Sequence, residues 1–344
     1  MIDIALLLVA AFLLTLPLVP ALTEWHVKRD VAPLRIVRTH DGNAGTFAAR
    51  FRTYVRELQP YQHAAGSAAD PSWVAVGRGG YPILDVNEYR KKRSDRGVLS
   101  EESIRLPDEF AFSREIYGGA DVYGGRANRL RAVLAERNLY LGDDSIVTRW
   151  VHAERVKANH GCRLSGRVSA DVEILIATGC MFRRLNAPRI LFGAGPWRKT
   201  ETKGGYRADA AVPGKRALRA RNGRVAPASR IDRNLLAQDA MRVGQAAEIS
   251  GSLKSGDNLT IAANARVEGA VSCGRDLFIG RGCHIRGPVL AEGRILIGPD
   301  CCIGDPGHPT TVSAPIILVG DRVVVFGSVW ARDGGAVVDW EGAS

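Results

Sequence analysis

The sequence lacks the short motifs on which many nucleotide-dependent and hydrolytic enzymes depend. No segment fits the P-loop pattern GxxxxGK[ST], so a nucleotide-driven motor or polymer is not supported. The nucleophile-elbow pattern GxSxG and the zinc-peptidase pattern HExxH are also absent. No CxxC pair occurs, and His152, His160 and His284 lack the spacing of a three-histidine zinc site. We therefore expect no metal, no cofactor and no catalytic residues of these classes.

Cysteine is scarce, with 6 in 344 residues, and aromatic residues make up only 7% of the chain. Four of the cysteines form two pairs 18 residues apart, Cys162 with Cys180 and Cys283 with Cys301. Alanine stands at the same place in other repeats (Ala247 and Ala265), so the position favours a small inward residue. We predict a buried, reduced core ladder; redox pairing or metal binding is the alternative.

Acidic residues are outnumbered: 36 Asp and Glu face 47 Lys and Arg, for a net charge of +11. An excess of this kind points to an anionic partner, either lipid or nucleic acid, and says nothing of the fold.

Residues 4–22 contain no charge and are long enough to cross a bilayer. A cleaved signal peptide would have a basic stretch before the apolar run, but only Asp3 precedes it. The first basic residues follow, from Lys28 onward, which places the body in the cytoplasm by the positive-inside rule. We predict that residues 1–22 are a retained, single-pass transmembrane anchor.

Residues 23–112 are predicted to be a connector with one amphipathic helix at 46–58. Phe47, Phe51, Tyr54 and Leu58 fall at helical spacing, and Pro60 is expected to end the helix. The helix is expected to pack against the body, with a position on the membrane surface as the alternative. From residue 60 to residue 112 we expect loops with little regular structure.

An 18-residue repeat begins further along the chain. The residues Leu277, Ile279, Cys283, Ile285 and Val289 recur when 18 is added or subtracted, with glycines in the same register. The repeat divides the chain into a first block at 113–192, a basic insert at 193–238, a second block at 239–332 and a tail at 333–344. A slip of four residues at 304–315 indicates an enlarged corner loop.

Eighteen residues fit three short strands, each with alternating inward and outward side chains, that close one triangular coil. Stacked coils bury a continuous core that one coil cannot bury alone, and glycine serves the sharp corners. We predict an all-β parallel β-helix of about nine coils. The expected core ladder is Leu164, Phe182, Ile249, Val267, Ile285, Ile303 and Val325.

The repeat contains a recurring V-x-G-x-V unit. It reads VEGAV at 267–271, IRGPV at 285–289, ISGSL at 249–253, VFGSV at 325–329 and LSGRV at 164–168. This pattern resembles the bactofilins, the polymer-forming cytoskeletal proteins of bacteria, some of which carry an N-terminal membrane segment. The resemblance implies a right-handed β-helix that stacks end to end into nucleotide-independent, nonpolar filaments. It also implies a scaffold that gathers partner proteins at the bacterial inner membrane. The split repeat and the long connector depart from the usual compact family member.

The alternative is a membrane-tethered hexapeptide-repeat acyltransferase, which is another triangular β-helix. The segments IGRGCH (279–284) and IGPDCC (297–302) are close to its repeat, and His308 lies in the enlarged loop where a general base would lie. A left-handed coil would distinguish this class from the right-handed coil of the bactofilins. The 18-residue spacing of the repeat does not reveal the handedness of the coil.

The insert at 193–238 carries 11 of the 47 basic residues. It is the candidate contact for an anionic partner, through Arg198, Lys199, Lys203, Lys215, Arg216, Arg219, Arg221 and Arg224. Acidic lipid, a protein partner and a merely solvated loop all remain open. Only Trp197 and Tyr206 offer stacking surfaces there, which disfavours nucleic acid.

Overall fold

The structure is a computed structural model, and it describes most of the body of the chain. The described residues are Thr15, Val19, 45–64 (58–64 as backbone only), 72–77, 79–196 and 217–340. The chain divides into a unit Met1–Asp41 and a unit Gly42–Ser344 that holds all the elements below. The expected anchor at 4–22 lies outside the described residues except for Thr15 and Val19. Within the described part, no helix has the length and apolar character needed to cross a bilayer.

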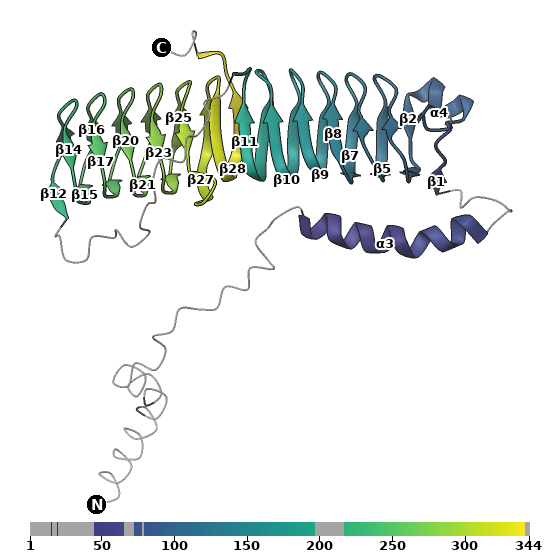
Figure 1. The fold of residues 1–344 in the computed structure, drawn as a ribbon, viewed down its shortest axis with the longest axis horizontal. Coiled ribbons are helices and arrows are strands. Elements are labelled where there is room, and N and C mark those ends of the chain that lie inside the picture. Colours follow the sequence, from purple (N-terminus) through teal and green to yellow (C-terminus); the bar gives the residue numbers. More distant parts are fainter. Residues whose placement is uncertain are drawn as a thin grey trace, which may run out of the picture. The chain divides into compact units, whose positions relative to one another are not determined.

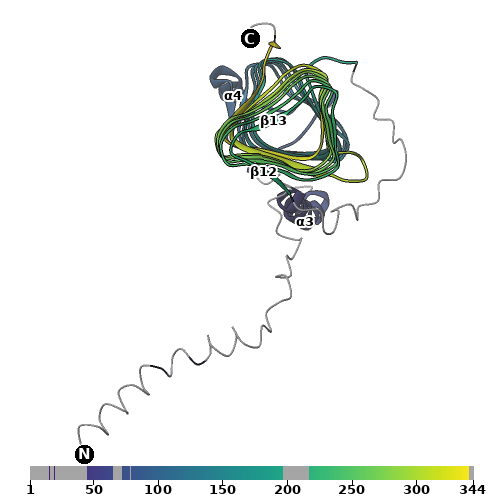
Figure 2. The same cartoon turned by 90° about the vertical axis from the view of Figure 1, so that its left-hand side faces the viewer.

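The second unit is a β-solenoid built from 28 short strands (Figure 1). Viewed end-on, its coils superpose into a triangular outline (Figure 2). This confirms the expected all-β parallel β-helix, but the stack has about 12 coils rather than about nine.

The first block of the solenoid contains the strands β1 to β11 and the short helix α4. Its elements are β1 (Trp73–Val74), α4 (Val86–Lys91), β2 (Arg93–Ser94), β3 (Gly97–Ser100), β4 (Ile104–Arg105), β5 (Ala111–Gly118), β6 (Val122–Tyr123), β7 (Arg129–Ala135), β8 (Asn138–Leu141), β9 (Ile146–Ala158), β10 (Arg163–Ile176) and β11 (Met181–Phe192).

The second block contains the strands β12 to β28. They are β12 (Leu218–Ala220), β13 (Gly223–Val225), β14 (Arg230–Ile231), β15 (Leu235–Ala237), β16 (Met241–Val243), β17 (Glu248–Ile249), β18 (Leu253–Ser255), β19 (Leu259–Ile261), β20 (Arg266–Val267), β21 (Val271–Cys273), β22 (Leu277–Ile279), β23 (His284–Ile285), β24 (Val289–Ala291), β25 (Arg294–Ile297), β26 (Cys302–Ile303), β27 (Thr310–Val319) and β28 (Val323–Val337).

Inward side chains stack in ladders because parallel pairing joins equivalent positions of successive coils. In the second block one ladder runs Ile249, Val267, Ile285, Ile303 and Val325. In the first block Leu164 pairs with Phe182. All seven side chains are buried in one continuous core.

The two blocks run in opposite directions along the same axis. The last strand of the first block, β11, pairs antiparallel with the last strand of the second block, β28, joining Leu185 to Val329 and Ile190 to Val325. Figure 1 shows β12 at one end of the rod and β28 beside β11 in its middle. We call this contact the tail-to-tail junction.

The solenoid starts earlier in the second block than the predicted boundary at 239. Strands β12 to β15 lie inside the segment 193–238 and pair with the following coil, with Val225 opposite Val243 and Leu235 opposite Leu253. The pattern is masked in the sequence because Gly223 stands where Met241 stands one coil later. The non-repetitive insert is accordingly shorter than predicted.

The expectation of irregular loops at 60–112 is also wrong. Strands β1 to β4 and the start of β5 lie there, and Val98 and Ile104 pair with Ile116 and Val122 one coil on. The repeat is hard to see because α4 interrupts it. In α4, Asp85 forms a capping box with Glu88, and the Tyr89 ring lies 6.1 Å from the Phe110 ring at this end of the core.

Two of the three corners of each coil differ in what they require of the residue that occupies them. At the first corner the backbone is left-handed in every coil, yet Ala246, Asn264 and Asp300 occupy it with φ of 54°, 58° and 61°. At the second corner a Cβ on Gly269 would lie 2.6 Å from the Gly251 carbonyl carbon. Glycine there permits close approach of successive coils rather than a sharp turn.

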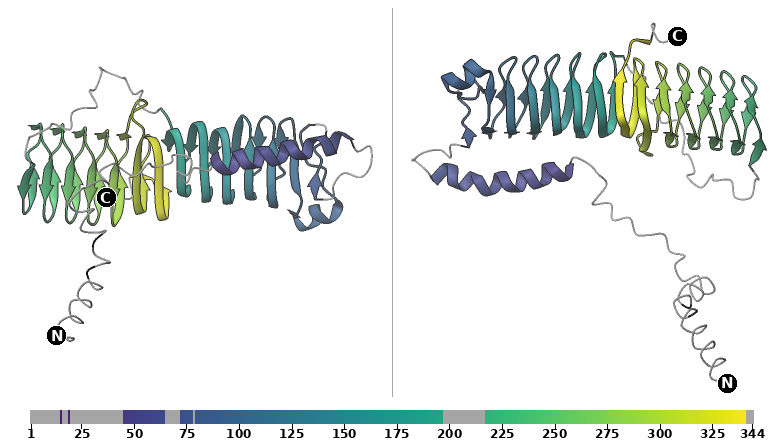
Figure 3. Two further views of the ribbon diagram at one scale, coloured as in Figure 1. Left: turned by 90° about the horizontal axis from the view of Figure 1, so that it is seen from below. Right: turned by 180° about the vertical axis from the view of Figure 1, so that it is seen from behind.

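Helix α3 (Gly45–Ala64) runs along the first block (Figure 3). Ala48 and Val55 are buried on its inner face, and Phe51 contacts Trp150 of β9 with ring centroids 5.8 Å apart. Arg52 forms an ion pair with Glu136 at 2.9 Å. The predicted packing against the body is thus observed, but the helix continues past Pro60 instead of ending there.

Candidate anion-binding site

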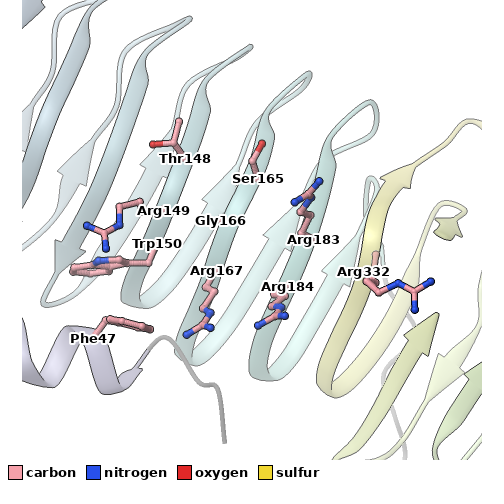
Figure 4. Close-up of a pocket in the computed structure, with 11 residues that line it drawn as sticks. Phe47, Thr148, Arg149, Trp150, Ser165, Gly166, Arg167, Arg183, Arg184 and Arg332 are labelled. Carbon is pink, nitrogen blue, oxygen red and sulfur yellow. The ribbon is translucent and has the colours of Figure 1, made fainter. Parts of the chain in front are cut away.

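A cleft of about 430 Å³ lined by arginines lies beside the tail-to-tail junction (Figure 4). We call it the arginine cleft, after the five side chains Arg149, Arg167, Arg183, Arg184 and Arg332. The rest of its lining is Phe47, Thr148, Trp150, Ser165, Gly166 and Ala331. It is built from α3, from β9 to β11 of the first block and from β28 of the second.

Strand register places the arginines on neighbouring coils. Trp150, Arg167, Arg184 and Trp330 are consecutive partners in one ladder that crosses the junction. Neighbouring strands lie about 4.8 Å apart. Figure 4 shows the guanidinium groups of Arg167 and Arg184 pointing the same way from β10 and β11.

Gly166 leaves a gap between Arg149 and Arg183 on the corner of the same coils. A Cβ at this position would lie 2.1 Å from the carbonyl oxygen of Arg149, so only glycine fits. The missing side chain leaves part of the cleft floor as bare backbone beside the guanidinium groups.

Aromatic rings hold two of the arginines in place. The Arg167 guanidinium carbon lies 5.0 Å from the centre of the Phe47 ring, and that of Arg184 lies 4.4 Å from the centre of the Trp330 ring. A cation over an aromatic face is attracted by the ring quadrupole. Both side chains are half-buried, so their orientation is set before any ligand arrives.

The positive charges of the cleft arginines are scarcely balanced by nearby carboxylates. Within the described residues no carboxylate lies at ion-pair distance from Arg149, Arg167, Arg183 or Arg184, whereas Arg332 lies 3.5 Å from Asp333. The hydroxyls of Thr148 and Ser165 add neutral hydrogen-bond donors to the cleft.

The arrangement can bind an anion, because guanidinium groups form bidentate hydrogen bonds with phosphate and carboxylate groups. The lining holds no carboxylate, imidazole or thiol for acid–base or nucleophilic chemistry.

Of the eight contacts predicted from the basic insert, the structure describes three. Arg198, Lys199, Lys203, Lys215 and Arg216 are outside the described residues. Arg219, Arg221 and Arg224 lie in or beside β12 and β13 at the far end of the second block, where Arg221 pairs with Asp239 at 3.2 Å. None of the three lines the arginine cleft. The cleft escaped the sequence analysis because its arginines are dispersed in sequence and no run of basic residues marks them.

His308, the alternative general base, lies in the enlarged loop before β27. Arg286 Nη2 is 2.8 Å from His308 Nδ1, and Asp305 Oδ1 is 3.0 Å from the same nitrogen. The Arg286 side chain also forms an ion pair with Asp305 at 2.7 Å. This network orients the imidazole within its own loop, and the arginine cleft does not include it.

A serine, a histidine and an aspartate meet on the outer side of β9 and β10. His152 Nδ1 lies 2.7 Å from Ser169 Oγ, and His152 Nε2 lies 3.4 Å from Asp171 Oδ2. A nucleophilic serine must be reachable by substrate. Ser169 is 1% exposed and His152 is 3% exposed, so the cluster is a buried polar contact rather than a catalytic triad.

The cysteines behave as small core residues. All six are buried and none forms a disulfide. Each thiol of the two stacked pairs donates to a backbone carbonyl, for example Cys180 to Asn159 at 2.9 Å and Cys301 to Gly280 at 3.0 Å. The neighbouring Cys283 thiol and burial together raise the pKa of Cys301. Among the described residues no cluster of three or more His, Cys, Asp or Glu is arranged to hold a metal ion.

Comparison of the chain with protein-family models, with curated proteins and with solved structures finds no match. The resemblance to the bactofilins expected from the repeated V-x-G-x-V unit therefore stays a prediction.

Proposed function

We propose that this protein is a membrane-anchored, bactofilin-like structural scaffold. Residues 4–22 would anchor it in the bacterial inner membrane, with a right-handed solenoid in the cytoplasm. The solenoid would associate end to end without nucleotide and recruit partner proteins along its sides. No cofactor and no catalytic residue enter this proposal.

The observation that carries the proposal is the tail-to-tail junction. The C-terminal coils of two solenoid blocks meet through β11 and β28, and the apolar core runs across the contact without a break. The two coil ends are thus complementary enough to pair strand to strand. End-to-end assembly of separate chains would need a contact of the same kind.

The two outer ends of the rod differ in what they offer to another copy. At the first block, β1, β2 and β4 pair only with the following coil, but α4 is packed beside them, with the Tyr89 ring 6.1 Å from the Phe110 ring. At the second block, β12, β13 and β14 each pair only with the following coil, so within the described residues their outer edges carry no strand. Unpaired edges are templates for further strands. Assembly is proposed to start at this end.

Electron microscopy and sedimentation of the full chain in detergent, without nucleotide and at several salt concentrations, test the proposal. Filaments or rods joined end to end would support it. A monodisperse single rod under all conditions would contradict it. Extraction of native membranes with alkaline carbonate tests the anchor separately, because an integral chain stays in the pellet.

A further inference from the structure

We propose that the arginine cleft and the outward face of α3 form one surface that binds the phosphate headgroups of anionic lipid. The inference rests on the membrane scaffold proposed above. It concerns a different part of the chain from the anchor at 4–22 and from the basic insert. Binding here would hold one side of the rod against the bilayer.

The charges of the cleft match several headgroups rather than a single anion. Arg149, Arg167 and Arg184 come from successive coils, which lie about 4.8 Å apart, and Arg332 extends the series onto the second block. Each guanidinium is a planar fork suited to phosphate oxygens. The four arginines without a carboxylate partner keep their charge available for an external ligand.

Helix α3 adds the second feature of a membrane-facing surface. Its inner face is buried on β9, while Phe47 and Tyr54 are 37% and 47% exposed on its flanks. Arg50 and Arg56 are also exposed. Aromatic rings next to basic side chains are typical of elements that lie at the headgroup level of a bilayer. Phe47 belongs to both parts, since it lines the cleft and lies on α3.

The aromatic groups argue against nucleic acid as the ligand. Bases bind such surfaces by stacking on free aromatic faces. Here one face of Phe47 and one face of Trp330 are covered by guanidinium groups, and Trp150 is only 7% exposed. The cleft thus offers more free charge than free stacking surface, which suits a headgroup layer.

Flotation of residues 42–344 with lipid vesicles tests the inference, because Gly42–Ser344 is a self-contained unit that lacks the anchor. We expect the protein to float with mixed phosphatidylglycerol and phosphatidylcholine vesicles and to stay behind with phosphatidylcholine alone. Arg149→Gln with Arg183→Gln removes two exposed charges and leaves both ring contacts intact. We expect this variant to partition about tenfold more weakly. Arg167→Gln with Arg184→Gln should weaken binding at least as much.

The control is Arg242→Gln with Arg266→Gln, two exposed arginines of the second block outside the cleft. It should float like the parent, and circular dichroism should show the same melting curve for all variants. Equal binding of the cleft and control variants would overturn the inference, as would failure of the parent protein to float. Tighter cleft-dependent binding of soluble polyphosphate or of single-stranded DNA would assign the cleft to another ligand. Each of these results leaves end-to-end assembly to be decided by its own experiment.

Discussion

The guanidinium of Arg184 lies 4.4 Å from the centre of the Trp330 ring, and this contact joins the two solenoid blocks. Arg184 belongs to β11 and Trp330 to β28, and the two residues are direct partners in the antiparallel register. One ladder of outward side chains therefore continues from one block into the other.

Removal of this charge is expected to weaken the junction. Arg184→Met keeps the apolar stem but loses the cation–π attraction, so the free energy of unfolding should fall by about 1 kcal/mol. Urea titration followed by tryptophan fluorescence measures the change. Arg163→Met, at an exposed arginine of β10, is the matched control and should leave stability unchanged. An equal loss in both variants would show that the ring contact contributes nothing.

The two blocks should remain associated after the chain between them is cut. A protease site inserted at 200–213 would separate β11 from β12 in sequence without touching either strand. Because Leu185, Ile190, Val325 and Val329 would otherwise be exposed, we expect both halves to elute together in gel filtration. Elution of two separate halves would contradict the junction.

The corner at Ala246 and the corner at Gly269 should respond in opposite ways to substitution. Ala246→Gly removes a side chain from a left-handed position with φ of 54°, and should raise stability by about 1 kcal/mol. Gly269→Ala places a Cβ 2.5 Å from Ser252 Oγ, and should lower stability by about 2 kcal/mol. Thermal melting of both variants measures the pair. A stabilised Gly269→Ala protein would refute the explanation from coil spacing.

The thiols should be unreactive while the protein is folded. All six are buried, so native protein should not react with a thiol reagent such as Ellman's reagent on the timescale in which free cysteine does. Guanidinium-unfolded protein should release the full signal. Prompt reaction of Cys162 or Cys180 in the native state would indicate that the coils open locally.

Stability should fall as the solution becomes mildly acidic. Burial lowers the pKa of His152 and of His284 below the value of 6.5 for an exposed imidazole. The unfolded chain therefore binds protons first, so the contribution is complete above about pH 6.5 and is lost as pH falls toward the folded-state pKa values. His152→Gln together with His284→Gln should flatten the pH dependence between pH 7 and about pH 5. Unfolding free energies at several pH values measure it, and an unchanged slope would show that other groups dominate.

His308 distinguishes the scaffold from the acyltransferase alternative. Under the proposed function, His308→Ala should leave assembly and stability within about 0.5 kcal/mol of the parent, because the side chain is exposed in a loop. Isothermal titration with acetyl coenzyme A tests for a donor site. Binding of the donor by a discrete trimer, with loss of turnover in His308→Ala, would favour the enzyme.

Much of the fold could be predicted because every coil repeats the same inward positions. The ladder from Ile249 to Val325 is visible in the sequence at a fixed spacing, apart from one enlarged loop. The outermost coils were missed because Gly223 and the α4 interruption weaken the pattern locally. A coil whose apolar repeat is interrupted is hard to recognise in the sequence. Stacking on a neighbouring coil still determines its position in the structure.

The direction of the second block and the arginine cleft could not be predicted in this way. Inward ladders look the same whether two end coils meet in parallel or antiparallel, so the residues of β11 and β28 do not reveal their pairing. Arg184 and Arg332 are neighbours in the cleft only because the second block runs backward. Contacts of this kind depend on chain topology, which an 18-residue repeat does not encode.

The reversal of the second block also decides where the C-terminus emerges. Val337 exchanges backbone hydrogen bonds with Gly179 and Cys180, which lie just before β11. The chain therefore leaves the solenoid near the middle of its length, at the junction of the two blocks, rather than at either end. A fluorescent protein fused after residue 344 would project sideways from the middle of the rod. Both tips would stay free, so such a fusion could report the length and position of assemblies in living cells without capping them.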